Sequence, residues 1–336
     1  MAMRKNRVSA SLFFTTCATL ALACSLSGAA PKPSAAPTTF PSPTPNRESR
    51  IPTEAVKIQP AQDLMPPVLH QPDWEPPIPL PGQVNTAGAE DSPFITLDGG
   101  RMYFFFTPDA GIPAQEQLGD GVTGIYMARL EGDQWVDVQR VSLASPGELA
   151  LDGCPTALGD ALWFCSARAG NLREIDLWIA KIEGDQHIHW VNAGELLNTT
   201  YEVGEMHLSS DGQCLYYHSR RAGGLGGMDL WELRRQGETW DEPRNLQALN
   251  SEGDEGWPYL TPDGQELWFT RAYQGSPAIF RSLKGDSGWS EPDLILSSFA
   301  GELAMDPQGN LYFTHHFVDQ EGIIEADIYV AYRRTP

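Results

Sequence analysis

The sequence is poor in positive charge. It contains 23 lysine and arginine residues against 44 aspartate and glutamate residues, which gives a formal net charge of −21 at pH 7. Such a chain repels the phosphate backbone of nucleic acids and the headgroups of anionic lipids. We therefore expect no nucleic-acid partner and no electrostatic attachment to a membrane.

The N-terminal apolar run is too short to cross a bilayer comfortably. It extends from Ser9 to Ala23 and follows a stretch with three cationic side chains, Arg4, Lys5 and Arg7. The run ends in leucine and alanine residues directly before Cys24. This arrangement resembles a bacterial lipoprotein signal, which implies that residues 1–23 are removed as a signal peptide and that the Cys24 thiol carries a lipid.

Lipidation at Cys24 would attach the mature protein to a membrane on its extracytoplasmic side, at the cell surface or in the periplasm. The alternative is ordinary signal-peptidase cleavage near Ala29 and Ala30. Residues 24–53 are rich in proline, serine, threonine and alanine, a composition that favours an extended tether over a packed core. Residues 54–73 are interrupted by proline and give no clear pattern.

Beyond residue 89, one pattern of about 50 residues occurs five times, which is typical of repeat architectures. Each unit begins with an acidic residue and a short strand, followed by an aromatic strand, a third strand and a strand with tryptophan. Asp-Gly and Gly-Gly turns separate these strands. The pattern predicts an all-β fold, a five-bladed β-propeller of four-stranded antiparallel blades over residues 54–336, with blades starting near 90, 152, 202, 254 and 302.

The fifth unit ends without a tryptophan strand of its own. That strand lies upstream, because the segment after Trp74 copies the segment after Trp240. We expect residues 74–80 to form the outer strand of the last blade, which closes the ring and protects its edges.

Three segments carry a resemblance to a known family: residues 219–231 with their glycine-rich turn, residues 240–246, and residues 250–269. They resemble the TolB-type, WD-like β-propeller repeat of bacterial envelope proteins. The resemblance implies an interaction scaffold with a protein or glycan ligand.

The acids before the first strand of each unit are expected to converge around one mouth of the central channel. They could bind Ca²⁺ or another hard cation, or hydrogen-bond a sugar. Alternatively, each accepts hydrogen bonds from backbone amides of an adjacent blade. No other cofactor is indicated. The candidates are Glu90, Asp91, Asp152, Glu202 or Glu205, Glu255 and Glu302.

Two of these carboxylates could also act as general acid and nucleophile or base in a glycoside hydrolase. Residues 90–96 resemble the first catalytic segment of arabinanase-like enzymes, whereas nothing clearly matches their other two segments. A Ser-His-Asp or Cys-His constellation is not identifiable from spacing. The main interpretation is therefore a binding module, and a glycan-processing hydrolase is the alternative.

The remaining polar candidates favour structural roles. Pairing Leu158 with Ala161 across a short turn would place Cys154 opposite Cys165, where an oxidising compartment favours a disulfide. The histidines are scattered and are expected to be packing or surface residues. Two arginines are expected to pair with an acid on the next strand of their own blade: Arg168 with Asp176, and Arg221 with Asp229.

Overall fold

The computed structural model describes residues 46–320 and 322–335. The expected signal peptide, Cys24 and most of the expected tether lie outside these residues. Within the described part, no helix is both long and apolar enough to span a membrane. The fold is nearly all β, and its strands pair almost entirely in antiparallel fashion.

The repeated units fold into successive hairpins, with irregular or helical segments only in their connections. The short helical segments are the 3₁₀ helices η2 and η3, the α-helix α1 and the π-helix η4: Arg47–Arg50, Pro60–Gln62, Ala114–Gln117 and Leu196–Thr200. In chain order, the strands are β1 Val68–Leu69, β2 Ile78–Pro79, β3 Ala89–Ile95, β4 Arg101–Thr107, β5 Gly124–Glu131, β6 Gln134–Arg140, β7 Ala150–Leu158, β8 Ala161–Arg168, β9 Asp176–Glu183, β10 Gln186–Asn192, β11 Met206–Leu208, β12 Cys214–Ser219, β13 Asp229–Gln236, β14 Thr239–Trp240, β15 Arg244–Asn245, β16 Glu255–Leu260, β17 Glu266–Tyr273, β18 Ser276–Gly285, β19 Gly288–Trp289, β20 Asp293–Ser297, β21 Ala300–Met305, β22 Leu311–Val318 and β23 Ile323–Ala331.

Hydrogen bonding joins these strands into four sheets. One has the order β10-β9-β8-β7, a second runs β11-β12-β13-β14 with β15 beside β13, and a third runs β1-β20-β18-β17-β16 with β19 beside β18. The fourth, β21-β22-β23-β3-β4-β5-β6 with β2 beside β23, contains two antiparallel runs. A single parallel pair, Ala326 with Ala89, joins them.

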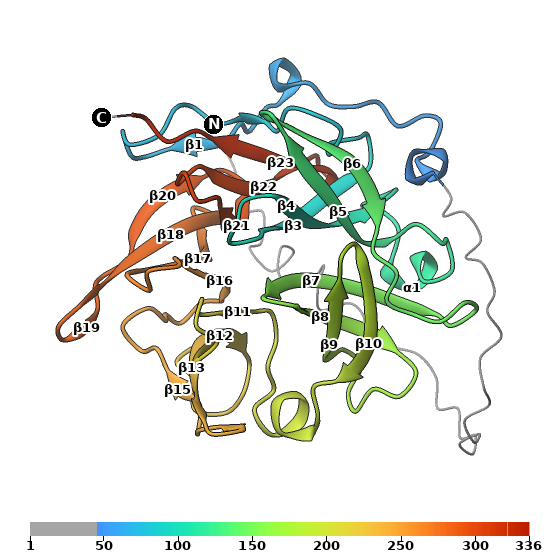
Figure 1. The fold of residues 1–336 in the computed structure, drawn as a ribbon. Helices are drawn as coiled ribbons and strands as arrows, with labels where there is room; N and C mark the ends of the chain where they lie inside the picture. Colours follow the sequence, from blue (N-terminus) through green and yellow to red (C-terminus); the bar gives the residue numbers. More distant parts are fainter. Residues whose placement is uncertain (1–45, 321, 336) are drawn as a thin grey trace, which may run out of the picture.

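The sheets stand around a common centre, with β3, β7, β11, β16 and β21 nearest to it (Figure 1). These inner strands contact one another in a closed cycle, from β3 to β7, β11, β16, β21 and back to β3. Apolar clusters fill the spaces between neighbouring antiparallel runs; one of them packs Phe104 and Trp135 of the first run against Tyr312 of the last. This radial arrangement of antiparallel sheets is the architecture of a β-propeller.

The N-terminal part of the described chain adds strands to the outside of the last two sheets in the sequence. Ile78 and Pro79 pair with Val330 and Tyr329 of β23, in the segment expected to close the ring. Val68 and Leu69 pair with β20, a contact that the sequence did not predict. The first strands of the described chain therefore lie beside its last strands.

Residues 46–69, which we call the strap, pack on the sheets although the range expected to be tether extends to residue 53. Arg47 is buried and donates to the Glu90 carboxylate at 3.0 Å and to the carbonyls of Gln83 and Val84 at 2.8 and 2.7 Å. Its guanidinium lies within 5.5 Å of the ring centres of Phe104 and Tyr126. The strap is therefore part of the folded body from its first helical turn.

Arg47 fills a position that other units fill from their own second strand. Arg168 lies over Phe164 and pairs with Asp152, and Arg271 lies over Phe269 and pairs with Glu255. Both arginines follow their acid by 16 residues. In the first unit the residue at this spacing is Phe106, opposite Glu90, so a residue from outside the repeat supplies the guanidinium.

Further contacts fix the rest of the strap. Lys57 pairs with Glu325 at 2.5 Å and also with Asp327, both of them buried acids of β23. The Asp63 carboxyl group and the Nε2 atom of the buried His315 share a hydrogen bond of 2.8 Å. The strap therefore connects the first and last units of the chain.

We predict that Arg47→Ala destabilises the whole fold. Removing one member of a buried ion pair leaves an uncompensated charge and costs about 3–5 kcal/mol. Arg50, exposed on the same helical turn, provides the matched control, and Arg50→Ala should change the free energy of unfolding by less than about 0.5 kcal/mol. Urea denaturation of soluble protein beginning near residue 30 measures both, and equal midpoints for the two variants would refute the structural role of Arg47.

A second prediction concerns pH. Burial raises the pKa of Glu90 from 4.5 to about 7, and the attraction of Arg47 only partly opposes this. A carboxyl whose folded pKa is raised stabilises the fold fully below its unfolded pKa, and this contribution is lost as the pH rises through 7. Wild-type stability should therefore increase as the pH falls from about 7.5 toward 5, by at most about 1.4 kcal/mol per pH unit for this group.

The variant Glu90→Gln tests this assignment because it keeps the side-chain shape and cannot titrate. Its free energy of unfolding, measured in urea at several pH values, should depend less on pH than that of the wild type. Asp327, whose pKa burial also raises to about 7, remains in both proteins. Parallel stability profiles for the two proteins would rule out Glu90 as a titrating group.

Candidate functional site

The inner strands are bulged at their midpoints. The pairing register of β3, β7, β16 and β21 shifts between Asp91 and Phe94, Gly153 and Thr156, Gly256 and Tyr259, and Gly301 and Ala304. One residue of each bulge has a left-handed backbone, with φ between 49° and 55°: Ser92, Cys154, Trp257 and Glu302. Bulges of this kind redirect side chains, and here they bring these residues to the central pocket.

The candidate acids occupy three different positions relative to the bulge. Glu90, Asp152 and Glu255 lie two residues before the left-handed residue, and Asp91 lies one residue before it. Glu302 is itself the left-handed residue, and Glu205 aligns with it because Leu208 pairs with Leu215 as Leu260 pairs with Leu267. The repeat pattern alone makes all these acids look equivalent, but Glu205 and Glu302 are displaced by two residues from Glu90, Asp152 and Glu255.

Acids at the first position have structural partners. Glu90, Asp152 and Glu255 each pair with an arginine at 2.6 to 3.0 Å. Glu90 and Glu255 also accept a backbone N–H from the residue four positions earlier, at 2.9 Å in both cases. These acids are thus hydrogen-bond acceptors, but these donors are arginine side chains and, for Glu90 and Glu255, a backbone N–H four residues earlier in the chain, whereas the alternative expected donors in an adjacent blade.

The expected arginine pairs differ from those observed. Arg168 pairs with Asp152, not Asp176, whose carboxylate accepts instead from the backbone of Leu172 at 2.6 Å. Arg221 lies over the ring of Trp231, 4.7 Å from its centre. In both units the acid of the third strand accepts backbone N–H groups from the loop before it, and the arginine contacts a different residue.

Asp91, Glu205 and Glu302 form a second, interacting group. Burial raises the pKa of Asp91 well above its ordinary value, and the negative charges of Glu302 and Glu205 raise it further. The Glu302 carboxylate accepts hydrogen bonds from the Ser92 backbone at 2.8 Å and from the Thr314 hydroxyl at 2.9 Å. Carboxyl groups of two other repeat units thus act on Asp91 near the centre.

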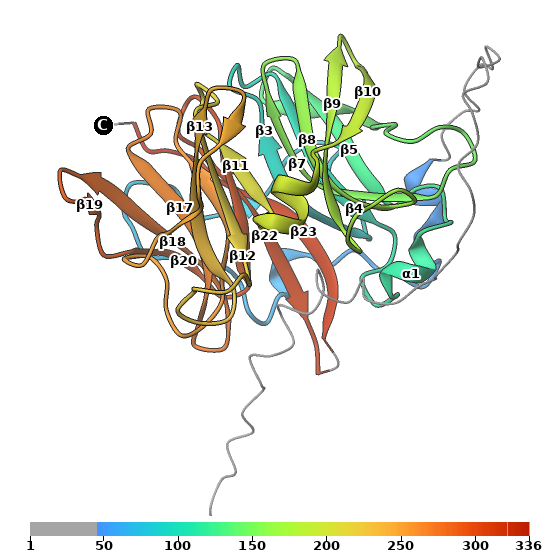
Figure 2. The ribbon, with the colours of Figure 1, turned by 90° about the horizontal axis from the view of Figure 1, so that it is seen from below.

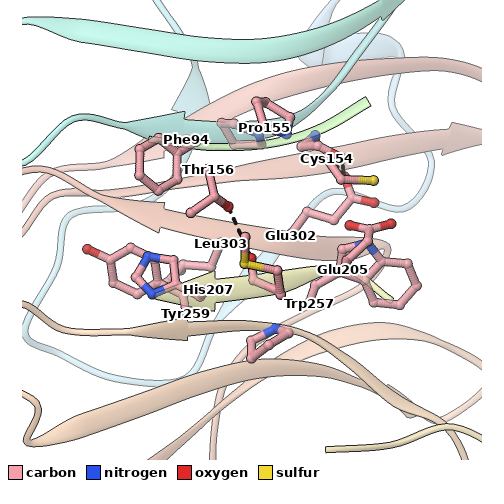
Figure 3. A pocket seen from close by; sticks show the side chains of 14 residues that line it. Phe94, Cys154, Pro155, Thr156, Glu205, His207, Trp257, Tyr259, Glu302 and Leu303 are labelled. Atoms are coloured by element: carbon pink, nitrogen blue, oxygen red, sulfur yellow. Dashed lines mark hydrogen bonds between the residues drawn. The ribbon is translucent and has the colours of Figure 1, made fainter. Parts of the chain in front are cut away.

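A narrow pocket of about 50 Å³ lies on the central axis. At one end lie Glu205, Trp257 and Glu302, and at the other lie the rings of His207 and Tyr259 (Figure 3). The His207 ring is 4.6 Å from that of Tyr259, and its Nδ1 atom accepts from the Leu260 backbone at 3.2 Å. Burial lowers the pKa of His207 to about 3, so this histidine is a neutral packing residue.

A wider cavity of about 490 Å³ adjoins this pocket and shares Ser92, Cys154, Trp257 and Glu302 with it. Asp91, Asp152 and His316 also line it. Residues from the loop before α1 and from the β22–β23 hairpin contribute to its wall, and these two segments lie on the same side of the molecule (Figure 2). The cavity is therefore the candidate ligand site.

The predicted disulfide is not formed between the described cysteines. Leu158 pairs with Ala161 as expected, but the bulge in β7 places Gly153, not Cys154, opposite Cys165. Cys165 is a free thiol. The bulge is the physical reason, since it moves the backbone at Cys154 out of the regular register.

The acids do not form a metal centre of the expected kind. Within residues 46–320 and 322–335, no group of three or more histidine, cysteine, aspartate and glutamate side chains is arranged to hold an ion. Glu202, the alternative to Glu205, also has a left-handed backbone and lines neither of these cavities. Sequence reasoning missed two residues of the site, Trp257 and His316. Trp257 could have been found because it lies two residues after the repeat acid Glu255, and His316 because it lies next to His315.

No protein-family model matches the chain, and no curated protein matches it in sequence. Solved structures similar to it include TolB from Acinetobacter baumannii, with 14% identity and a TM-score of 0.42 over 72% of this chain and 54% of that one. An endo-arabinase from Bacteroides thetaiotaomicron has 13% identity and a TM-score of 0.45 over 76% of this chain and 98% of that one. The chain thus spans about half the length of the first protein. These similarities concern the fold and assign no activity or ligand.

Proposed function

We propose that the chain is a five-bladed β-propeller whose central cavity binds a ligand. The closed cycle of five inner strands supports this blade count. So does the single parallel pair within the eight-stranded sheet, which divides that sheet between the first and last blades. On this view β2 is the outer strand of the last blade.

The observation that carries the binding function is the cavity of about 490 Å³ where the bulged strands meet. Ligand sites are typically concave, mostly apolar and furnished with a few convergent polar groups. Here Asp91, Glu302 and His316 provide polar groups, while Phe105 and Trp257 provide aromatic surface. The ligand is a glycan or protein segment of the cell envelope.

A second candidate function is glycoside hydrolysis, favoured by one observation. Asp91 has a raised pKa beside Glu302 and Glu205. A protonated carboxyl next to an ionised one is the pair that glycosidases use. Binding remains the first choice because the Glu302 carboxylate also helps to fix a bulge, through its contact with the Ser92 backbone.

We also propose that the protein is exported and held to a membrane by a lipid on Cys24. The basic start, the short apolar run and the cysteine support this proposal. The strap begins 22 residues beyond Cys24, at the end of a proline-rich stretch that is suited to act as a spacer. The binding cavity would then face the extracytoplasmic space.

The binding proposal predicts that filling the cavity abolishes binding. Ala167 lines the cavity and is partly exposed, so Ala167→Phe should obstruct it without overpacking the core. In a screen of soluble protein against cell-envelope glycans and peptides, this variant should lose at least about tenfold in affinity. Val191→Phe, at an exposed position of β10, is the control and should bind like the wild type. Equal binding by both variants would move the ligand site elsewhere.

The same mixtures distinguish binding from hydrolysis. Under the binding proposal no reducing ends appear when glycans are incubated with the protein. Release of reducing ends by the wild type, abolished in Asp91→Asn and Glu302→Gln, would establish the hydrolase instead.

The anchoring proposal predicts that Cys24→Ser releases the protein from membranes. Without the lipid, nothing in the described chain spans a bilayer, and the acidic surface is not attracted to one. Fractionation of expressing cells, with immunodetection in membrane and soluble fractions, measures the change. A neighbouring substitution, Ser25→Ala, controls for expression, and retention of Cys24→Ser in the membrane fraction would refute lipid anchoring.

A further inference from the structure

The wall of the wide cavity is acidic and otherwise largely apolar. Asp91, Asp152 and Glu302 line it, and no lysine or arginine is among the described residues that do so. Phe105, Pro277 and Ala326 are among its apolar lining. A ligand that complements this wall carries positive charge together with apolar surface.

Among the described residues, a cation pairs with only one of these three acids. The Asp152 carboxylate pairs with Arg168 at 2.6 Å. The charged groups that act most strongly on Asp91 are Glu302, Glu205 and Glu90, all of the same sign. The hydrogen-bond donors to Glu302 are the neutral groups of Ser92 and Thr314. Negative charge is thus concentrated at the cavity wall.

His316 provides an independent indication of a ligand. It lines the same cavity, and its Nδ1 atom is buried without a hydrogen-bond partner among the described residues. Burial lowers the pKa of His316, so the ring is neutral although Glu302 is nearby. A buried polar atom without a partner is costly, and a ligand that hydrogen-bonds to it removes that cost.

We propose that this cavity binds an organic cation, an ammonium or guanidinium group on an aliphatic stem, with the charged head at Asp91 and Glu302 and the stem along Phe105 and Ala326. The proposal rests on the ligand-binding function proposed above and specifies its ligand class. Lysine and arginine side chains have this amphipathic form, and cations of this kind also bind the faces of aromatic rings such as Trp257. A bare metal ion fits less well, because it requires several oxygen ligands where this wall is apolar.

Binding of the cation releases a proton from Asp91. A bound cation favours the ionised form of Asp91, whose pKa is raised in the free protein. Affinity should therefore increase with pH. The titratable groups that face Asp91 are Glu302 on β21, Glu205 before β11, Glu90 on β3 and, beside Glu302, His316 on β22.

Titration calorimetry with Nα-acetyl-lysine N-methylamide tests the proposal, on the same soluble protein beginning near residue 30. The uncharged control is Nα,Nε-diacetyl-lysine N-methylamide, which should bind at least about tenfold more weakly. Asp91→Asn and, independently, Glu302→Gln should each weaken binding of the charged probe by about tenfold. Glu131→Gln, at an exposed position of β5, removes the same charge elsewhere and should leave the affinity unchanged.

Two buffers of different ionisation enthalpy reveal the proton. The observed binding enthalpy should differ between phosphate and Tris for the wild type, and this difference should vanish in Asp91→Asn. Equal affinity for charged and uncharged probes, or unchanged affinity in both acid variants, would overturn the proposal. If the wild type binds envelope glycans and Ala167→Phe does not, the binding function stands and only the proposed ligand class fails.

The source of the cation is distinguished by two further probes. Exposed aliphatic side chains occur in the loops on the cavity side: Ile112 before α1, Leu149 before β7, and Ile324 in the β22–β23 hairpin, with exposures of 37%, 59% and 47%. If the cation belongs to a polypeptide, acetyl-Leu-Lys-Leu-amide should bind more tightly than n-butylammonium because its flanking leucines contact this rim. If the ligand is a small amine, n-butylammonium should bind at least as tightly as the peptide.

Discussion

The bulge in the inner strands is the constraint on which the site depends. A regular strand would alternate its side chains between two faces, but the left-handed residues Ser92, Cys154, Trp257 and Glu302 bring extra side chains to the axis. Neighbouring repeat units hold two of these strained positions. The Ser92 backbone donates to Thr314 at 3.1 Å, and the Glu302 backbone donates to Thr270 at 3.1 Å. The bonds that stabilise these two bulges therefore also join one repeat unit to the next, so the geometry of the site depends on the assembly of the ring.

The second requirement is a cation for each buried first-position acid. Two arginines from the second strands satisfy Asp152 and Glu255, but the first unit has Phe106 at that spacing and relies on Arg47. A residue outside the repeat has therefore become part of the repeat's core. This explains why a proline-rich segment of unpromising composition folds at all: the free energy of ordering it comes from the buried carboxylate and the aromatic rings that receive its guanidinium.

The period and the aromatic pattern were sufficient to predict the β-propeller class and the order of strands within each unit. They also predicted that a segment within residues 74–80 pairs with the last unit of the chain. The register within a strand was not predictable from the sequence. Glu255 and Glu302 look alike in the repeat pattern, and only the position of the bulge shows that they differ by two residues relative to it. The same shift misplaced Cys154 relative to Cys165. The strap was missed for another reason, since its contacts join residues far apart in the chain and leave no local periodicity.

The contrast between the two groups of acids is the strongest physical argument for where the site lies. This chain carries a large excess of negative charge, yet it places arginine or lysine against several of its buried acids, among them Glu90, Asp152, Glu255 and Asp327. Another buried acid, Asp229, is held by neutral donors, the Leu225 backbone and the Asn245 side chain. At Asp91 the chain instead brings Glu302 and Glu205 close, which disfavours ionisation and costs stability. Among the described residues, acids therefore repel one another at this cavity, and a positively charged ligand there would relieve that repulsion.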